Sequence, residues 1–217
     1  MNERVSLKTA DGVTIVGDYY EGGGDKHVLL LHMMPATRAS WVAFANQLVA
    51  DGYSAFAIDL RGHGESTAGP LGALDYRNFT DLDHQQSIAD VQVAIEYLRE
   101  RGMKEISIAG ASIGANLAFV YAASHPEVQS VILLSPGLLY RGVNTEIAAS
   151  QISDRTKIFL LVSSEDEYAA ASVKDLYEKI KSQHKKIEIL DGAGHGTTML
   201  ERRPEYLAVL SNWLSRK

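Results

Sequence analysis

Ser112 stands in the pentapeptide GASIG of residues 110–114, a Gly-x-Ser-x-Gly pattern that can present a nucleophile. The largely apolar run 106–109 before it is typical of a buried strand, and residues 115–121 after it favour a helix. In a tight strand-to-helix turn the central serine adopts a strained backbone conformation, and the flanking glycines let neighbouring elements approach. The hydroxyl would project at the helix amino terminus, where the N–H groups and the helix dipole favour negative charge. The pattern predicts that Ser112 is a nucleophile.

A serine hydroxyl needs a general base, which is usually a histidine held in one tautomer by a carboxylate. His195 is the candidate base because it lies in the glycine-rich segment DGAGHG of residues 191–196, directly after the last apolar run. The candidate acid follows the preceding strand, where Glu165, Asp166 and Glu167 stand in a row. Since such a triplet is usually a solvated turn or a helix start, we expect only one of the three to take part. The chain order serine, acid, histidine fits a Gly-x-Ser-x-Gly turn.

Acyl transfer also requires hydrogen-bond donors for the oxyanion of the tetrahedral intermediate. The backbone N–H of Ile113, immediately after the nucleophile, is one expected donor. The second is expected from the segment HMMP of residues 32–35, which follows the third apolar strand. We expect His32 to orient or pack rather than to act as a base, because the segment of His195 already supplies one. The pair Met33 and Met34 is either core filler or the rim of an acyl pocket.

Short apolar runs alternate with segments of helical period along the chain, and these elements must position the candidate residues. Asp11-Gly12 predicts a hairpin, so the fold should open with antiparallel strands. Five strand–helix alternations follow, and their mostly continuous apolar strands indicate an α/β protein with a parallel sheet covered on both faces. Ligands of such sheets bind outside the carboxyl ends of the strands, so the loops after residues 31, 58, 109, 134, 162 and 190 should surround one crevice. The glycine-rich segment 59–72 predicts an irregular loop.

Composition limits the class of protein. The 217 residues, 46% hydrophobic and 22% charged, predict one globular domain spanning 1–217. The net charge of −6 argues against nucleic acid or an anionic membrane surface as a partner. No cysteine is present, which excludes thiolate catalysis, and neither a His-x-x-x-His nor a Gly-x-Gly-x-x-Gly motif occurs, so we expect no metal and no cofactor. The polar amino terminus and the lack of a long apolar run predict a cytoplasmic protein without a membrane span.

Taken together, the motifs resemble those of α/β-hydrolase-fold serine esterases, and most of all small bacterial carboxylesterases and dienelactone-hydrolase-like proteins. The resemblance rests on GASIG, HMMP, DLRGHGES at 59–66, the acidic triplet and GAGHG, and it covers nearly the whole chain. It implies an eight-stranded, mostly parallel sheet with Ser112 as nucleophile, Asp166 as acid and His195 as base. Ser164 stands where the family commonly has glycine two positions before the acid, which leaves Glu165 as the alternative.

The resemblance further implies that the backbone N–H of Met34 is the second oxyanion donor, because the family's HGxP motif carries that donor two residues after its histidine. Met33 occupies the position of the glycine in this motif, so the loop should be stiffer or its donor displaced. Dienelactone hydrolases proper use a cysteine nucleophile, which this chain lacks. Haloalkane dehalogenases and many epoxide hydrolases of the fold use an aspartate where Ser112 stands.

The substrate is expected to be a small-molecule ester. Only residues 136–155 separate the strand ending at Leu134 from the next one, which is too short for a helical lid domain. An open crevice suits small or short-acyl esters, and Leu138, Leu139 and Tyr140 form either a pocket wall or core beneath a loop. We therefore expect a serine carboxylic-ester hydrolase that works through an acyl-enzyme. The alternatives are another triad hydrolase (thioesterase, peptidase, perhydrolase or C–C hydrolase) and a non-catalytic ligand-binding relative. The sequence makes no prediction of oligomeric state.

Overall fold

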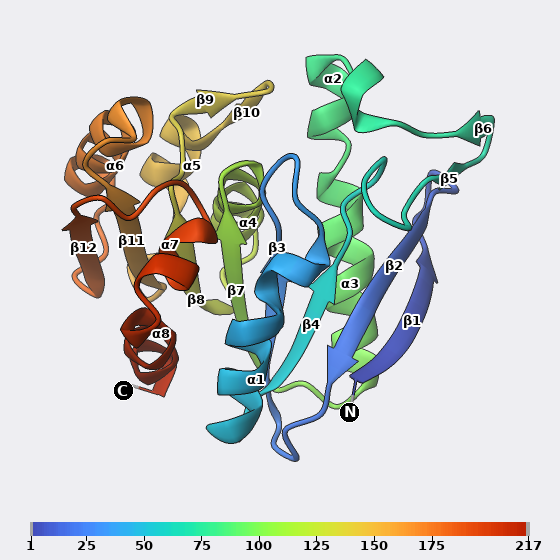
Figure 1. Ribbon diagram of the computed structural model, residues 1–217, viewed down its shortest axis with the longest axis horizontal. Helices are drawn as coiled ribbons and strands as arrows, with labels where there is room; N and C mark the ends of the chain where they lie inside the picture. Colours follow the sequence, from blue (N-terminus) through green and yellow to red (C-terminus); the bar gives the residue numbers. More distant parts are fainter. Residues whose placement is uncertain (1, 216–217) are drawn as a thin grey trace.

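A computed structural model gives the structure of residues 2–215, which are built around one eight-stranded sheet (Figure 1). The strand order is β1-β2-β4-β3-β7-β8-β11-β12. β2 pairs antiparallel with β1 and with β4, whereas the other neighbouring strands pair in parallel. The strands are β1 (Asn2–Lys8), β2 (Thr14–Tyr20), β3 (Lys26–Leu31), β4 (Ser54–Ile58), β7 (Glu105–Ala111), β8 (Val128–Leu134), β11 (Lys157–Ser163) and β12 (Lys185–Leu190). The predicted opening hairpin and mostly parallel sheet are confirmed.

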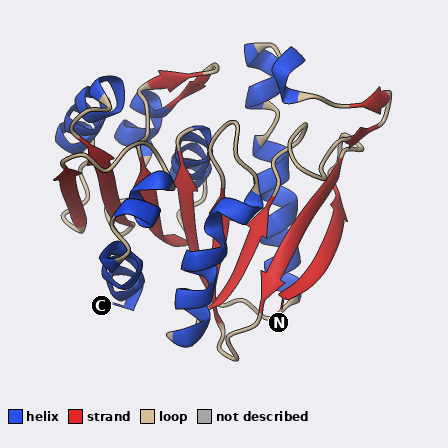
Figure 2. Cartoon of the chain, viewed as in Figure 1, coloured by secondary structure: helices blue, strands red, loops and turns tan. Residues whose placement is uncertain are grey.

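Helices cover both faces of the sheet, as Figure 2 shows. One face carries α3 (Ile88–Glu100), α4 (Ile113–Ser124), α5 (Thr145–Gln151) and α6 (Glu167–Lys179), and the other carries α1 (Val42–Ala50), α7 (Thr198–Arg202) and α8 (Glu205–Ser215). Along β3, Leu29 and Leu31 pack into the first of these two cores, and Val28 and Leu30 pack into the second. A strand buried on both faces needs a continuous apolar run, which is why the sequence shows no alternation there. No helix of residues 2–215 combines the length and the apolarity that crossing a bilayer requires.

Two insertions stand at the carboxyl edge of the sheet. After β4 come the short strands β5 (Ala68–Gly69) and β6 (Gly72–Ala73), the 3-10 turn η2 (Tyr76–Asn78) and α2 (Asp81–Gln85). After β8 come β9 (Leu139–Tyr140) and β10 (Val143–Asn144), which lead into α5. The loop prediction for 59–72 is therefore wrong in part, because β5 and β6 pair as a small hairpin. The second insertion is short, as predicted. The start of β1 and the end of α8 lie at the opposite edge (Figure 1).

Ion pairs with neighbouring elements hold the segment DLRGHGES in place. Asp59 accepts the backbone N–H of Arg38 at 2.8 Å and also binds its guanidinium. Arg38 opens the 3-10 turn η1 (Arg38–Trp41), which precedes α1. Arg61 donates to Asp90 of α3 at 2.9 Å and to Asp11 of the first hairpin at 2.7 Å. Each buried charge thus has an opposite partner, as burial demands, and the pairs tie the start of the first insertion to η1, to the turn of the first hairpin and to α3.

Candidate active site

Ser112 sits in the turn between β7 and α4 with φ +51° and ψ −117°. Positive φ is costly for a residue with a side chain, so the surrounding structure must hold it there. A Cβ on Gly110 would lie 2.2 Å from the carbonyl oxygen of Gly114, and a Cβ on Gly114 would lie 2.3 Å from that of Leu31. Only glycine fits at either position. The Ser112 N–H donates to the carbonyl of Leu134 at 2.8 Å, which anchors the turn to β8.

His195 meets Asp166, with 2.5 Å between Nδ1 and Oδ2. Because a carboxylate only accepts hydrogen bonds, this contact keeps the proton on Nδ1 and leaves Nε2 able to take another. Asp166 immediately precedes α6, and its side chain is 17% exposed against 44% for the imidazole. The histidine therefore reaches into the crevice while its carboxylate partner lies behind it.

Ser112 and His195 line the same cavity. Among the hydrogen bonds within residues 2–215, none joins the Ser112 hydroxyl to the imidazole. The contact between a nucleophile and its base is often loose before substrate binds. The presence of Ser112 and His195 in one cavity is therefore compatible with their acting together.

Glu165 contacts the loop of His195 rather than its ring. Its carboxylate accepts the N–H groups of Gly192 at 3.0 Å and Gly194 at 2.8 Å and the hydroxyl of Ser163. These hydrogen bonds, that of Ser163 first, lower the pKa of Glu165 to about 2. The two neighbouring acids thus have different positions: Asp166 holds the ring, and Glu165 fastens the loop that carries it.

The cavity at Ser112 has a volume of about 100 Å³. Its lining comprises Met34, Ser112, Ser135, Gly137, Tyr140, Tyr168, Ala169 and His195. Met33, expected as either core filler or pocket rim, does not line this cavity. Its sulfur packs beneath the neighbouring loop, 3.8 Å from the hydroxyl oxygen of Thr197 and 2.4 Å from where a Cβ on Gly196 would stand. Met33 and Met34 therefore point to different sides of their loop.

The three candidate pocket residues after β8 also lie in different surroundings. Tyr140 lines the cavity, as the pocket-wall alternative requires. Leu138 packs against the core on the α4 face, and Leu139 is 57% exposed. Neither leucine lines the cavity, and the alternation of side chains along β9 turns Leu139 away from the side of Tyr140. The hydroxyl of Tyr168 donates to the carbonyl of Leu139 at 2.7 Å and so fixes β9 to α6.

The two expected oxyanion donors lie at the ends of neighbouring elements. Ile113 is the first residue of α4, where amides have no acceptor inside the helix. Met34 follows β3, and its position is set by His32, which donates from Nδ1 to the carbonyl of Met33 at 2.8 Å and accepts the N–H of Leu60 at Nε2 (3.0 Å). Complete burial lowers the pKa of His32 to about 3, so the ring is neutral. Of the two roles expected for His32, orienting and packing, these hydrogen bonds favour the first.

Sequence reasoning missed two polar residues that support the site. The side chain of Asn116, fully buried in α4, donates to the carbonyl of Val143 at 3.1 Å and accepts the N–H of Gly137 at 2.9 Å. The hydroxyl of Ser135, whose φ is +50°, accepts the N–H of Gly196 at 3.1 Å. A lone asparagine in an otherwise apolar helical run was the one available signal for the first of these.

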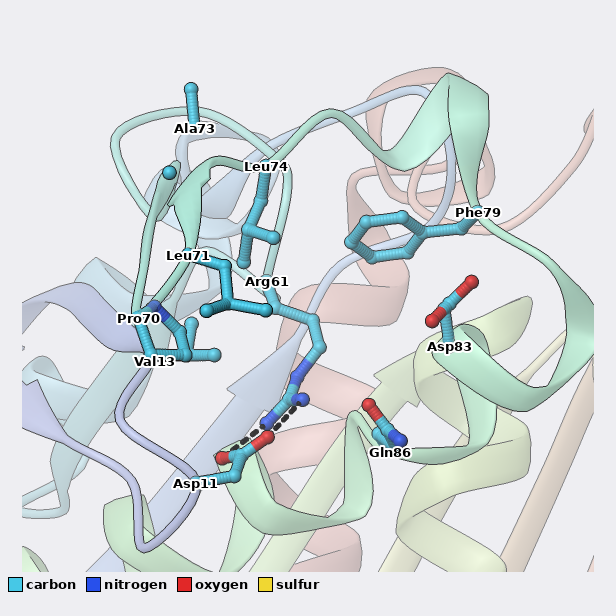
Figure 3. A pocket seen from close by; sticks show the side chains of 11 residues that line it. Asp11, Val13, Arg61, Pro70, Leu71, Ala73, Leu74, Phe79, Asp83 and Gln86 are labelled. Carbon is cyan, nitrogen blue, oxygen red and sulfur yellow. Dashed lines mark hydrogen bonds and ion pairs between the residues drawn. The ribbon is translucent and has the colours of Figure 1, made fainter.

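A separate cavity of about 230 Å³ lies between the first hairpin and the β5–β6 hairpin (Figure 3). Val13, Leu74 and Phe79 give it apolar walls, and Arg61 and Asp11 pair with each other on one side. Because Arg61 is neutralised in this way, the cavity offers no unbalanced cation. Within residues 2–215, no three histidine or carboxylate side chains come together as a metal site would require.

The sheet order, the turn at Ser112 and the His195–Asp166 contact define an α/β-hydrolase, and the comparisons agree. The family model described as alpha/beta hydrolase fold matches residues 26–151, more than half of the chain. This chain therefore belongs to the α/β-hydrolase fold family.

Individual relatives are distant. The chain is 26% identical over 145 residues to a putative 2-succinyl-6-hydroxy-2,4-cyclohexadiene-1-carboxylate synthase of Bacillus subtilis, covering 65% of this chain and 48% of that protein. It is 29% identical over 131 residues to the AB hydrolase superfamily protein YisY of the same organism, covering 59% and 44%. The chain thus spans about half the length of the curated relatives it matches.

Solved structures cover the whole chain. An esterase of Pyrococcus furiosus aligns with a TM-score of 0.81 at 20% identity, covering 100% of this chain and 91% of that one. A dienelactone hydrolase of Anabaena variabilis aligns with a TM-score of 0.78 at 21% identity, covering 99% and 96%. At such identities the likeness establishes a shared fold.

Proposed function

We propose that the protein is a serine carboxylic-ester hydrolase that cleaves short-acyl esters through an acyl-enzyme. The observation that carries the proposal is the pairing of His195 with Asp166 at a cavity that also holds Ser112. A loop histidine with a carboxylate behind it and a strained serine beside it is an arrangement that serves acyl transfer. The esterases among the similar structures are consistent with this reaction.

In the proposed mechanism, the Ser112 oxygen attacks the ester carbonyl while His195 Nε2 takes the hydroxyl proton. Asp166 keeps the imidazole oriented and stabilises its cation. The N–H groups of Ile113 and Met34 would bind the oxyanion, and one such donor is typically worth about 3–4 kcal/mol. His195 then returns the proton to the leaving alcohol. In the second half-reaction, His195 activates a water that hydrolyses the acyl-enzyme.

The size of the cavity supports a short acyl group. Its volume of about 100 Å³ is smaller than the roughly 150 Å³ of an apolar cavity that holds benzene. An acyl chain of a few carbons fits such a space, whereas a long chain would have to extend beyond it.

The test is hydrolysis of p-nitrophenyl esters from acetate to palmitate. We expect the native protein to prefer the short esters and Ser112→Ala to lose several orders of magnitude in kcat/KM. Ser150→Ala, a matched change at an exposed position of α5, should keep the native rate. Labelling with a fluorophosphonate separates the alternatives. A protein that labels at Ser112 but leaves all esters intact acts on another acyl bond, and one that does neither is a binding module.

A further inference from the structure

A second cavity adjoins the one at Ser112. It has a volume of about 380 Å³ and is lined by Met34, Pro35, Tyr76, Arg77, Phe79, His84, Tyr140 and Arg141. Met34 and Tyr140 line both cavities. A molecule whose carbonyl lies at Ser112 would reach the larger space by passing these two side chains.

The lining of the larger cavity is cationic. It includes two arginines and no carboxylate. Arg77 is balanced, because its guanidinium binds Asp75 with 2.7 Å between Nη2 and Oδ2. Arg141 forms no ion pair within residues 2–215, and its guanidinium lies over the ring of Tyr140, 5.8 Å from the centroid. Arg141 is thus the one arginine of this lining without an ion-pair partner within residues 2–215.

His84 adds a hydrogen-bonding group to this cavity without adding charge. Its ring is buried against Phe79, with 5.4 Å between the ring centroids. Burial, and then the nearby charge of Arg141, lower the pKa of His84, although Asp81 and Asp83 act in the opposite direction. The ring is therefore neutral at pH 7.

The backbone of Arg141 is strained. Tyr140 pairs with Val143, so Arg141 and Gly142 form a two-residue hairpin turn with φ of +50° and +74°. Turns of this kind favour Asn-Gly or Asp-Gly, because a residue with a longer side chain tolerates positive φ poorly. The tip also abuts α2, since a Cβ on Gly142 would lie 2.2 Å from Nε2 of Gln85. Figure 1 shows this hairpin and α2 on the side of the carboxyl ends of β3 and β7.

Arg141 thus stands at a strained position in the cavity that adjoins the candidate nucleophile, and it has no ion-pair partner within residues 2–215, which calls for a functional reason. We propose that Arg141 binds a carboxylate of the substrate, so that the preferred substrates are esters carrying one free carboxylate. This inference rests on the proposed function. The guanidinium fork matches a carboxylate, and the single charge of Arg141 matches a monoanion better than a doubly charged phosphate.

The first experiment compares matched charged and neutral esters. Mono-p-nitrophenyl glutarate is paired with p-nitrophenyl 5-methylhexanoate, in which an isopropyl group replaces the carboxylate. The butanoyl ester of 3-hydroxybenzoate is paired with 3-isopropylphenyl butanoate, which places the charge on the alcohol side. We expect the charged ester of at least one pair to have a kcat/KM about tenfold higher, mainly through a lower KM.

Arg141→Asn is the informative variant, because asparagine tolerates the left-handed backbone and the hairpin should fold. We expect the preference for the charged ester to disappear in it. Arg155→Asn is the matched control, since it removes the same charge at the amino end of β11, away from the crevice. The proposal is overturned if the native protein shows no preference for either charged ester, or if both variants reduce the preference equally.

Binding separates this proposal from the esterase proposal. Ser112→Ala is titrated calorimetrically with the mono-p-nitrophenyl glutarate used above, with and without Arg141→Asn. Saturable binding that weakens about tenfold on loss of Arg141 supports the anion site even if the native protein hydrolyses no ester. Absence of binding, or binding indifferent to Arg141, refutes the site even if ester hydrolysis is established.

Discussion

Asn116 offers a quantitative test of how the crevice is held together. Its side chain joins α4 to Gly137 and to Val143, and the segment between those two residues carries Tyr140 and Arg141. Replacing Asn116 with alanine removes two hydrogen bonds worth about 1 kcal/mol each. It also leaves the buried N–H of Gly137 without this acceptor, and an unsatisfied buried group costs roughly 1–3 kcal/mol. We therefore expect the free energy of unfolding to fall by about 3–5 kcal/mol.

Urea unfolding measures this loss, and Asn144→Ala provides the matched control. Asn144 caps α5 by accepting the N–H of Glu146 at 2.9 Å, at a partly exposed position where the same substitution typically costs about 1 kcal/mol. Asn116→Ala should also lower kcat/KM on a butanoate ester, because Tyr140 is then less firmly placed. A loss of stability no larger than that of Asn144→Ala would refute the reasoning, since it would show that the two buried bonds contribute little.

Three further predictions concern the groups around Ser112. Asp166→Asn should lower kcat on p-nitrophenyl butanoate by about 10⁴-fold with little change in melting temperature, because the tautomer of His195 is no longer fixed. Glu167→Gln, at the exposed next residue, should keep the native rate. Equal losses in the two variants would contradict the assignment of Asp166. His32 is neutral in the fold down to about pH 3, whereas the unfolded chain binds that proton below about pH 6.5, so unfolding takes up a proton between these values. The free energy of unfolding should therefore fall as pH drops from 6.5 towards 3, by up to about 1.4 kcal/mol per pH unit. In urea titrations at pH 5 and pH 7.5, His32→Gln should lose less stability between the two pH values than the native protein. An equal loss in both proteins would contradict this. Gly114→Ala forces a Cβ to 2.3 Å from a backbone carbonyl and should destabilise the protein by more than 2 kcal/mol, whereas Gly102→Ala, with positive φ but nothing within 4 Å, should lose only about 1 kcal/mol in the same denaturation assay.

Local sequence rules account for most of the fold. Asp11-Gly12 marked the first hairpin, and continuous apolar runs such as that of β3 marked strands buried on both faces. These signals depend only on neighbours in the sequence. The hairpin of β5 and β6 was missed because four glycines between residues 59 and 72 looked like an irregular loop, although two of them, Gly69 and Gly72, pair across its turn.

The candidate site could be predicted only in part from the sequence. Glycine patterns pointed to Ser112 and His195 because a sharp turn needs glycine whatever surrounds it. Which side of a loop a residue faces is set by its backbone angles and by distant packing, so the sequence could not show that Met33 turns under Gly196. For the same reason it left Glu165 and Asp166 as alternatives, although one fastens the loop and the other contacts the ring.

The placement of the chain ends has a practical consequence. Since β1 starts and α8 ends at the edge of the sheet opposite Ser112, a linker attached ahead of β1 or after α8 departs on that side. A protein coupled to a bead or an electrode through either end should present its crevice to the bulk solution. Immobilisation, display on a scaffold and fusion to a carrier are therefore compatible with free diffusion of small esters to the crevice.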